Sequence, residues 1–340
     1  MAKILIIGAG AMGTAFAYPC IDNKHDVNII GTHLENDLID QLNQKHFHSG
    51  LNLEILRDIK FFKYELIKKV FETKPDLIVI GVSSKGIEWV AEELKRNTYN
   101  GILPPLLMLT KGLSIYKNKY ELLVDKLTRL LNQKQIKNLN ISAVGGPCLA
   151  AGLANRVHSG VVIANKKLDI ANLIKKMLMT NYYHISTSVD INGVEVCAAI
   201  KNIFSMAIGA ASGLNKSKTK NNFHLNTSAA LVRQSIYEMG IFVEFLKGKK
   251  ETVNGLAGLG DLYVSSAGGR NSKMGALIGE GIAFSNAKKN KMPNVTVEGA
   301  ELIFEIGKKV KDDFNDKKLP LMIAMVNAIL EDKKLNIKWE

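Results

Sequence analysis

The first half of the chain alternates short apolar runs with amphipathic stretches. Six runs are rich in apolar residues and continuous enough to be strands buried on both faces: residues 3–7, 27–30, 77–80, 106–109, 141–144 and 161–163. Stretches with the 3.6-residue spacing of helices lie between them, among them residues 87–94 and 120–131. This alternation predicts a doubly wound parallel sheet with helices on both of its faces.

The pattern changes after about residue 186. The last strand-like segment is Tyr183–Ile185, and helical periodicity dominates from there on. We therefore predict an α/β domain over residues 1–187 and an all-α helical domain over residues 188–340. A polar segment at 215–226, with four Asn and three Lys, is expected to be a surface loop.

A glycine motif follows the first apolar run directly and leads into a helix-like stretch. The motif is Gly8-Ala9-Gly10-Ala11-Met12-Gly13. In that context Gly8 permits a tight turn, Gly10 lets the backbone approach a pyrophosphate, and Gly13 lets the helix pack on the strand. The helix N-terminus adds amide donors and a partial positive charge. The first domain is therefore predicted to be a Rossmann-type domain that binds NAD or NADP through Gly8, Gly10, Ala11, Met12 and Gly13.

The tip of the second apolar run bears on the choice of cofactor. NAD-specific sites usually place an acid there to hold the ribose 2′-hydroxyl. Here the residues are Gly31, Thr32 and His33, which tolerate a 2′-phosphate, so NADP is favoured over NAD. The alternative is that Glu35 or Asp37 reaches back to the ribose.

Ligands of doubly wound sheets bind beyond the carboxyl ends of the strands. Three further segments lie at such ends in this chain: residues 81–84, which include Ser83, residues 110–112, which include Lys111, and residues 145–147. Their placement predicts a binding site without identifying its chemistry.

The second half contains a lysine, Lys201, inside a mostly apolar helix-like stretch. Burial lowers the pKa of an ammonium group, so such a lysine can act as a base near neutral pH. The alternative is a side chain that follows apolar surface and keeps its ammonium in water. Two glycine-rich segments follow, at 254–262, which includes Asp261, and at 268–271, which includes Arg270. Small residues let backbone approach a ligand and Arg offers a planar fork for a phosphate, although either segment alone is more typical of a flexible loop.

Composition narrows the class of protein. The chain has 340 residues, 46% hydrophobic and 23% charged, as is ordinary for a globular enzyme, but its formal net charge is +13. The excess is mostly scattered Lys without an Arg-rich tract, so we expect solvated helix faces and no nucleic-acid partner.

The three cysteines are far apart and lack metal-ligand spacing, which predicts a reducing compartment and no metal site. The apolar N-terminus is similar to a signal peptide, but the glycine motif explains the same residues and no segment is expected to span a membrane, so we expect a soluble, cytoplasmic protein.

Taken together, these segments resemble the NAD(P)-dependent glycerol-3-phosphate dehydrogenase family over nearly the whole chain. Each matching piece is common, but their order is specific. In chain order the pieces are residues 8–13, 110–112, 146–147, 193–195, 199–202, 255–262, 268–271 and 297–299. The resemblance implies a Rossmann domain followed by an all-helical domain like the C-terminal domain of 6-phosphogluconate dehydrogenase. It also implies a homodimer that transfers hydride reversibly between NAD(P)H and dihydroxyacetone phosphate, giving sn-glycerol 3-phosphate for phospholipid and glycerol metabolism.

The resemblance further implies roles for individual residues. Lys201 would be the general base on the C2 hydroxyl, Lys111 would lie across the substrate, and Asp261 would orient the catalytic lysine. The residues implied to bind the phosphorylated small-molecule substrate are Lys111, Asn202, Asp261, Gly269, Arg270 and Asn271. Those implied to bind the cofactor, besides the glycine motif, are Thr32, Ser83, Ala150, Arg270 and Glu298.

The sequence departs from the family pattern after Gly146-Pro147. Family members commonly continue with Ser-Phe-Ala and an acid two residues later, whereas this chain continues with Cys148-Leu149-Ala150-Ala151-Gly152 and no acid. The alternatives are therefore a related dehydrogenase of another phosphorylated polyol or ketose, a hydroxy-acid dehydrogenase of the same architecture, and a catalytically silent dinucleotide sensor. The phosphate-binding segment at 269–271 argues against the hydroxy acid, and retention of both lysines and the aspartate argues against the sensor.

Overall fold

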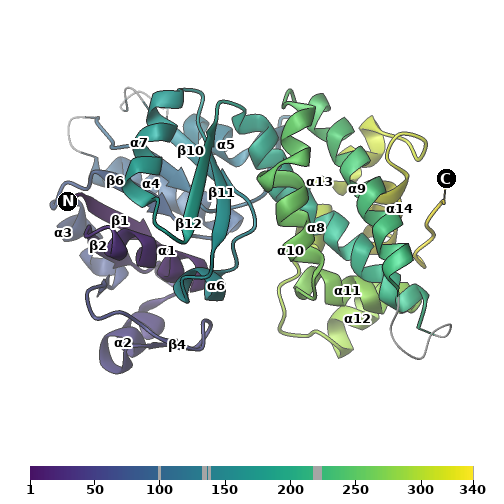
Figure 1. Ribbon diagram of the computed structural model, residues 1–340, viewed down its shortest axis with the longest axis horizontal. Helices are drawn as coiled ribbons and strands as arrows, with labels where there is room; N and C mark the ends of the chain where they lie inside the picture. Colours follow the sequence, from purple (N-terminus) through teal and green to yellow (C-terminus); the bar gives the residue numbers. More distant parts are fainter. Residues whose placement is uncertain (99–100, 132–135, 137–138, 217–223, 340) are drawn as a thin grey trace. The chain divides into compact units, whose positions relative to one another are not determined.

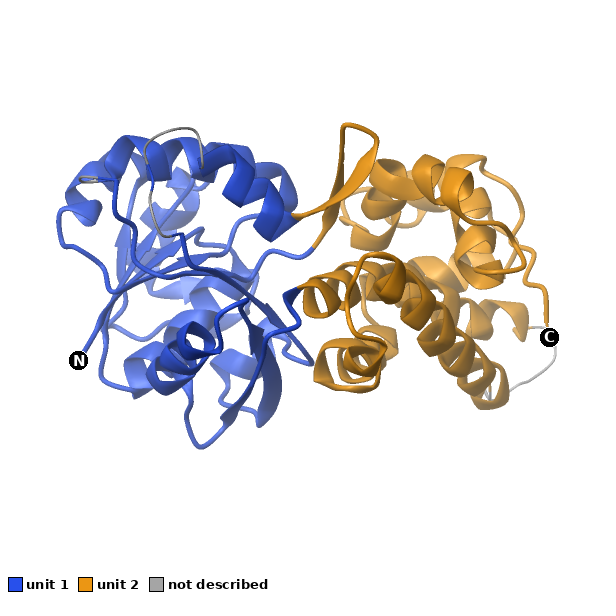
Figure 2. Ribbon diagram, turned by 90° about the horizontal axis from the view of Figure 1, so that it is seen from above, with its two compact units in different colours: residues 1–111, 123–191 blue, residues 112–122, 192–340 orange. Residues whose placement is uncertain are grey.

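The computed structural model describes residues 1–340 apart from 99–100, 132–135, 137–138, 217–223 and 340. The polar segment expected to be a surface loop thus lies largely outside the described residues. The chain forms two compact units, coloured blue and orange in Figure 2. Unit 1 comprises Met1–Lys111 and Leu123–Ile191, and unit 2 comprises Gly112–Leu122 and Asn192–Glu340. The sequence pattern predicts a single boundary after residue 187. Instead, residues 112–122 belong to unit 2, although the segments on both sides of them belong to unit 1.

Unit 1 is built on a sheet that has eight strands in the described part of the chain, in the order β12-β11-β10-β7-β6-β1-β2-β5. The strands are β1 (Lys3–Ile7), β2 (Asp26–Ile30), β5 (Lys60–Phe62), β6 (Leu77–Ile80), β7 (Leu106–Met108), β10 (Ile141–Gly145), β11 (Ser159–Ala164) and β12 (Tyr183–Ser188). Neighbouring strands are parallel except β10 and β11, which are antiparallel. Every residue of β6 is buried, as its continuous apolar run predicts for a central strand.

Helices cover both faces of this sheet, which confirms the predicted doubly wound architecture. One layer contains α1 (Ala11–Asp22), on which both α6 (Ala150–Ala154) and α7 (Leu168–Leu178) pack. The other contains α3 (Ile67–Phe71), α4 (Ile87–Asn97) and α5 (Leu123–Leu131). In Figure 1, α1 and α7 lie in front of the strands and α4 and α5 behind them. The connection after β2 adds α2 (Asn36–Lys45) and a hairpin of β3 (Phe47–His48) and β4 (Leu53–Glu54), which the hydrophobic pattern did not predict.

A second hairpin belongs to unit 2 and replaces the start of one predicted helix. The helix predicted over residues 120–131 begins only at Leu123, because β9 (Lys119–Leu122) pairs in antiparallel register with β8 (Leu113–Tyr116). Tyr120 of β9 packs edge-on against Phe242 and Phe245, with ring centroids 5.4 and 6.1 Å apart. These aromatic contacts hold the hairpin to α9, and Figure 2 shows the hairpin coloured with unit 2.

The rest of unit 2 is helical, as predicted. Its α-helices are α8 (Ile191–Leu214), α9 (Leu225–Phe245), α10 (Asp261–Ser266), α11 (Arg270–Gly279), α12 (Phe284–Asn290), α13 (Glu298–Asp313) and α14 (Pro320–Leu330). The glycine-rich segment that in isolation indicates a flexible loop is instead ordered: a 3₁₀ turn (Lys250–Asn254) and a π-helical turn (Leu256–Gly260) lead directly into α10. A Cβ on Gly258 would lie 2.1 Å from the carbonyl oxygen of Val253, so close packing requires glycine there.

The longest helix, α8, forms the centre of unit 2. Within the described residues it alone is long and apolar enough to cross a membrane, yet 89% of its most apolar window is buried inside the structure. Glycines bring α11 against it: a Cβ on Gly209 would lie 2.2 Å from the carbonyl oxygen of Ser272, and one on Gly275 would lie 1.9 Å from that of Met206. The helix therefore packs as a core helix, and its Lys201 contacts α10.

Candidate active site

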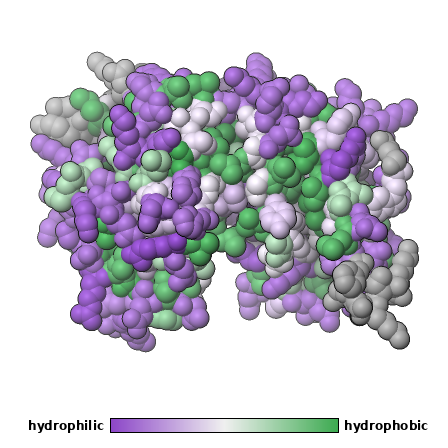
Figure 3. Space-filling view, in the orientation of Figure 1, coloured by the Kyte–Doolittle hydropathy of each residue, from purple (hydrophilic) through white to green (hydrophobic). Residues whose placement is uncertain are grey.

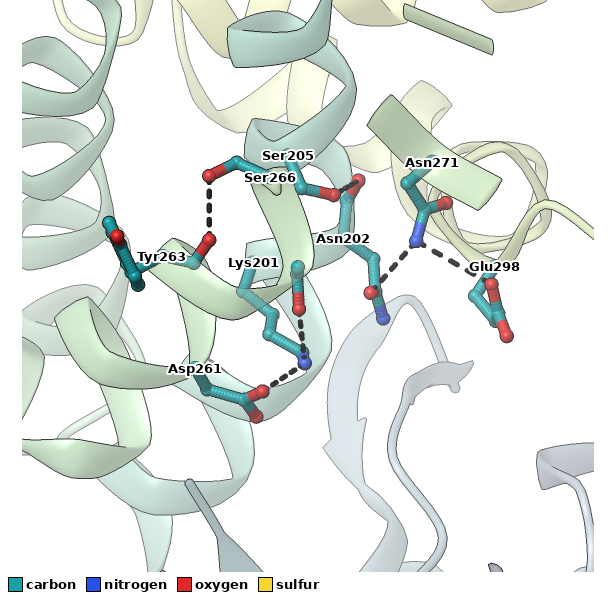
Figure 4. A network of polar contacts seen from close by, with 9 residues as sticks. Lys201, Asn202, Ser205, Asp261, Tyr263, Ser266, Asn271 and Glu298 are labelled. Atoms are coloured by element: carbon teal, nitrogen blue, oxygen red, sulfur yellow. Dashed lines mark hydrogen bonds and ion pairs between the residues drawn. The ribbon is translucent and has the colours of Figure 1, made fainter. Parts of the chain in front are cut away.

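The ammonium group of Lys201 is buried and held by two side chains of α10. The residue is 6% exposed, its Nζ forms an ion pair with the carboxylate of Asp261, and it donates a hydrogen bond to Ser265 Oγ at 2.7 Å. Asp261 is itself only 2% exposed, and Figure 4 shows its carboxylate next to the Lys201 ammonium. Asp261 and Ser265 are four residues apart on one helix, so they face the same side and meet the same ammonium. The alternative of a lysine with its ammonium in water is therefore wrong.

A second polar network lies beside this ion pair and joins α8, α11 and α13 (Figure 4). Asn271 Nδ2 donates to Asn202 Oδ1 at 3.0 Å and lies 3.5 Å from Glu298 Oε2, while its Oδ1 accepts from the amide of Gly299 at 2.9 Å. These partners fix the orientation of the Asn271 amide. Asn202 is thereby used as an acceptor, and within the network drawn in Figure 4 its Nδ2 group remains available to donate to a ligand.

Arg270 adds a positive charge at the start of α11. Gly269 is the N-cap residue of that helix and contributes no side chain, so the first amides of α11 are not covered from that position. The guanidinium forms an ion pair with Glu298, the first residue of α13. A guanidinium next to a helix N-terminus is a favourable place for a phosphate. Unit 2 thus brings together the predicted residues Lys201, Asn202, Asp261, Gly269, Arg270, Asn271 and Glu298.

Ser265 is a site residue that the sequence analysis did not identify. It is in direct contact with the Lys201 ammonium, yet a serine in a short polar helix has no distinctive pattern. The available signal was its spacing of four residues from Asp261, which becomes meaningful only once residues 261–266 are known to be helical.

The glycine motif of unit 1 has the geometry that a dinucleotide requires. Gly8 has a φ of +107°, and a Cβ there would lie 3.0 Å from the backbone of Gly81. A Cβ on Gly13 would lie 2.2 Å from the carbonyl oxygen of Gly8, so only glycine lets α1 pack on the turn. At Gly10, in contrast, the nearest atom to an added Cβ is 3.8 Å away, which leaves room for a pyrophosphate to approach the amides that begin α1.

Three side chains hold the peptide groups of Ala9 within this motif. Glu35 Oε2 accepts hydrogen bonds from the amides of Ala9 at 3.2 Å and Thr32 at 2.7 Å, so this acid does reach back to the glycine turn. On the other side, His48 Nε2 bonds to the Ala9 carbonyl at 3.1 Å and Thr14 Oγ1 donates to the same oxygen at 2.9 Å. Because His48 Nδ1 accepts from a backbone amide, its Nε2 carries the proton and is the donor. His48 is not predicted from the sequence, since the residues of the hairpin that places it have no distinctive hydrophobic pattern.

The tip of β2 also carries an aromatic cluster. His33 lies in the loop after β2, with its ring 5.7 Å from that of Trp89 and 6.4 Å from that of Tyr64. Trp89 belongs to α4, which follows β6, and Tyr64 follows β5. The exposed His33 side chain is therefore flanked by two rings that the sequence analysis did not identify.

The remaining predicted residues lie at strand ends of unit 1. Ser83 follows β6, Lys111 follows β7, and Ala150 begins α6 after β10. Thr110 Oγ1 donates to the carbonyl of Val82 at 2.7 Å and joins two of these ends. This edge is where ligands of doubly wound sheets bind, as predicted from the strand pattern.

The chain just after the segment that departs from the family pattern is held by an ion pair to α1. Arg156, just after α6, donates two hydrogen bonds of 2.8 Å to the carboxylate of Asp22 in α1, and Tyr182 Oη donates to the same carboxylate at 2.6 Å. The Arg156 guanidinium holds the pKa of Asp22 below its ordinary value. Within the altered segment, Cys148 and Ala150 pack partly buried against the core, whereas Leu149 is 62% exposed.

Hydrophilic side chains are spread over the visible face of each unit rather than gathered in one patch (Figure 3). Many lysines are paired with acids at the surface, for example Lys60 with Asp26 at 2.8 Å and Lys216 with Glu280 at 2.8 Å. This distribution agrees with the solvated helix faces inferred from the scattered Lys residues.

Family models match both halves of the chain. The model for the N-terminus of NAD-dependent glycerol-3-phosphate dehydrogenase matches residues 3–171, and the model for its C-terminus matches residues 190–338. An NADP(+)-dependent glycerol-3-phosphate dehydrogenase of Archaeoglobus fulgidus is 29% identical over 320 residues, which cover 91% of each chain. A glycerol-3-phosphate dehydrogenase [NAD(P)+] of Clostridium botulinum is 28% identical and covers 99% of this chain and 96% of its own.

Solved structures agree with these matches. The structure of glycerol-3-phosphate dehydrogenase from Coxiella burnetii superposes with a TM-score of 0.82 at 25% identity, covering 98% of this chain and 96% of that one. The Plasmodium falciparum enzyme, at 22% identity, has a TM-score of 0.83 over 100% of this chain and 96% of its own, and supports the fold alone.

Proposed function

We propose that this chain, which belongs to the NAD-dependent glycerol-3-phosphate dehydrogenase family, transfers hydride reversibly between NAD(P)H and dihydroxyacetone phosphate, giving sn-glycerol 3-phosphate. The family makes it an NAD(P)-dependent oxidoreductase that acts on a CH–OH group. The observation that carries the proposal is the buried Lys201 ammonium, held by Asp261 and Ser265 beside the Asn202–Asn271 network.

Lys201 acts as the general acid for ketone reduction and as the general base in the reverse direction. When the reduced nicotinamide supplies a hydride to C2 of the ketone, the carbonyl oxygen gains negative charge and needs a proton. The Lys201 ammonium donates that proton, and in the reverse direction the neutral amine takes it from the C2 hydroxyl. Asp261 stabilises the charged form of the lysine, while Ser265 directs the ammonium as a hydrogen-bond partner.

Substrate oxygens are held by the residues around this lysine. Asn202 offers its Nδ2 group, and Arg270 with the first amides of α11 holds the phosphate dianion. Lys111, at the end of β7, supplies a second ammonium to the anionic substrate. Holding the phosphate fixes the position of C2 and contributes to catalysis by orientation.

The glycine motif of unit 1 fits the pyrophosphate of NAD or NADP, with Gly10, Ala11 and Met12 at the start of α1. Thr32 and the exposed His33 at the tip of β2 support acceptance of the NADP 2′-phosphate. Glu35 supports NAD instead, although its carboxylate already accepts two backbone amides. We expect both cofactors to be used, with NADP preferred.

Two further expectations do not come from the geometry: the homodimer is implied by the family resemblance, and the cytoplasmic location is inferred from the cysteines and the N-terminal motif. We expect the chain to be a cytoplasmic homodimer, and sedimentation of the purified protein tests the second part directly. A monomer over the concentration range of the activity assay would contradict it.

A dehydrogenase of a different phosphorylated ketose is the second candidate. The run Cys148–Gly152, which lacks the acid common in the family, favours it, because this segment begins at the carboxyl end of β10, where ligands of such sheets bind.

The test is the loss of reduced-nicotinamide absorbance with NADH and NADPH in turn, on addition of dihydroxyacetone phosphate. Rapid oxidation confirms the reaction, and the ratio of kcat/KM values gives the cofactor preference. Cofactor binding without oxidation rejects this substrate and favours the other phosphorylated ketoses, which are then assayed in the same way.

A further inference from the structure

The guanidinium proposed to hold the substrate phosphate is already bound by a carboxylate of the same chain. Arg270 begins α11 and Glu298 begins α13, and their side chains form an ion pair. The Arg270 side chain is 57% exposed and that of Glu298 is 38% exposed, so the pair lies at the surface rather than in the core. The carboxylate thus takes the place at Arg270 that a ligand anion would take.

Glu298 has other partners that would remain if Arg270 left it. Its Oε1 faces Arg270, whereas its Oε2 lies 3.5 Å from Asn271 Nδ2. As the first residue of α13 it also lies near the unpaired amides and the positive end of that helix. The carboxylate would therefore not be left without favourable interactions.

On binding a phosphate, Arg270 would replace a carboxylate partner by one with more negative charge and more acceptor oxygens. A phosphate monoester carries nearly two negative charges and three terminal oxygens, against one charge and two oxygens for a carboxylate. The first amides of α11 add donors that a phosphate can reach together with the guanidinium. A neutral, unphosphorylated ligand has no charge with which to displace the carboxylate.

We propose that Glu298 is an internal competitor for Arg270, which a substrate phosphate must displace in order to bind. The identity of the substrate rests on the proposed function, but the exchange itself applies to any phosphate at this site. Because Arg270 leaves Glu298 only when a phosphate binds, the ion pair selects phosphorylated over unphosphorylated ligands.

The exchange is measured by titrating the cofactor-free full-length protein with inorganic phosphate and with sn-glycerol 3-phosphate, followed by calorimetry and by the shift in melting temperature. The proteins are the wild type, Glu298→Gln, Arg270→Gln and the double variant. Glu301→Gln is the control, because it removes the same charge from the same helix one turn further on. Since an exposed ion pair is worth little, we expect Glu298→Gln to bind both ligands about two- to fivefold more tightly than the wild type.

The double variant separates competition from a general effect of charge. If Glu298 acts through Arg270, Glu298→Gln should change phosphate binding hardly at all in the Arg270→Gln background. Equal tightening in that background, or in Glu301→Gln, would show a general field and overturn the proposal. Weaker binding by Glu298→Gln would show that Glu298 positions Arg270, and no phosphate binding by either protein would show that Arg270 is not a phosphate ligand; both results reject it.

These binding measurements do not depend on turnover. Failure to reduce dihydroxyacetone phosphate, with the expected phosphate pattern intact, would reject the proposed substrate and leave the exchange standing. Turnover of dihydroxyacetone phosphate without the expected pattern of phosphate binding would support the proposed substrate and reject the exchange.

Discussion

At the scale of single residues, burial determines the chemistry available to Lys201. An isolated ammonium at that depth would lose several kcal/mol of solvation, so it is stable only with a partner such as Asp261. The same pairing that makes the lysine tolerable in the core of unit 2 also fixes where its proton is delivered. In unit 1, close backbone contacts require glycine at positions 8 and 13. At Gly10 the space around an added Cβ is free of close contacts, which leaves room for a ligand.

Replacing Lys201 by Met should remove the proton donor while leaving cofactor binding intact. We expect kcat to fall by about 10²- to 10⁴-fold, the range typical of the loss of a general acid or base. Binding of NADPH, followed by its fluorescence, should be unchanged because the glycine motif lies in unit 1. Lys216→Met, which breaks a surface pair with Glu280, is the matched control and should turn over normally. Turnover near the wild-type rate in Lys201→Met would reject the role of this lysine.

Ser265→Ala should have a smaller effect on the same step. Removing one hydrogen bond to a charged group costs about 1.5–3 kcal/mol at most, so we expect kcat to fall by roughly 10- to 100-fold with little change in KM. Ser265→Thr keeps the hydroxyl and should restore most of the rate. An increase in KM alone would instead indicate that Ser265 binds substrate.

At the scale of elements, helix termini are held by buried or bridging carboxylates. Glu238 of α9 is fully buried, and its two oxygens accept from the amides of Leu321 at 2.7 Å and Met322 at 2.8 Å at the start of α14. Gln234 donates to the same carboxylate at 2.9 Å. The carboxylate thus satisfies amides that have no partner within α14 and complements the dipole of that helix.

Glu238→Ala should therefore leave two buried amides without acceptors. We expect a loss of about 2–4 kcal/mol in the free energy of unfolding, measured by urea denaturation. Glu244→Ala on the same helix is the control, because that side chain is about half exposed and its pair with Lys250 at 3.7 Å is loose. Equal effects of the two substitutions would show that α14 does not depend on Glu238.

The ion pair between Asp22 and Arg156 joins α1 to the segment after α6 and predicts a pH dependence. Because the pKa of Asp22 is lowered in the folded state, the pair contributes stability above the unfolded pKa of about 3.9 and loses it as the pH falls through the folded pKa. Arg156→Gln should therefore reduce stability by about 0.5–1 kcal/mol at pH 7, a value limited by solvent screening of this partly exposed pair. The difference from the wild type should vanish at low pH, and a constant difference across the titration would contradict the assignment.

At the scale of the whole molecule, the boundary between the units is crossed more than once. The hairpin β8–β9 belongs to unit 2 although both flanking segments belong to unit 1. Its aromatic anchor is Tyr120, packed on Phe242 and Phe245. A cut at one position in the sequence would therefore separate the helical unit from part of its own core.

Tyr120→Ala should destabilise unit 2 selectively. We expect a loss of about 2–3 kcal/mol for truncating a partly buried aromatic ring, with faster proteolysis in residues 192–340 and unchanged binding of NADPH to unit 1. Tyr116→Ala, at the exposed end of the same hairpin, serves as the control. Uniform proteolysis of both units in the Tyr120 variant would show that the hairpin does not stabilise unit 2 in particular.

The sequence by itself determined those features that are encoded locally. Continuous apolar runs predicted β1, β2, β6, β7, β10 and β11, because a strand buried on both faces has no polar alternation. The glycines at 8, 10 and 13 predicted the turn before α1, since the positive φ of Gly8 and the contact of Gly13 with the Gly8 carbonyl arise within the motif itself. The ordered motifs gave the family and named Lys201, Asp261, Asn271 and Arg270, and the structure brings these four together in unit 2.

Only the tertiary structure decided the contacts between segments far apart in the chain. Glu35 and His48 hold the two sides of Ala9 because the connection after β2 folds back on the glycine turn, and no pattern in residues 31–55 specifies that return. Ser265 reaches Lys201 across 64 positions, and β9 replaces the start of a predicted helix because it finds β8 as a partner. The physical reason is the same in each case: local propensity is weak, and pairing or burial against a distant segment contributes more free energy than the local preference it overrides.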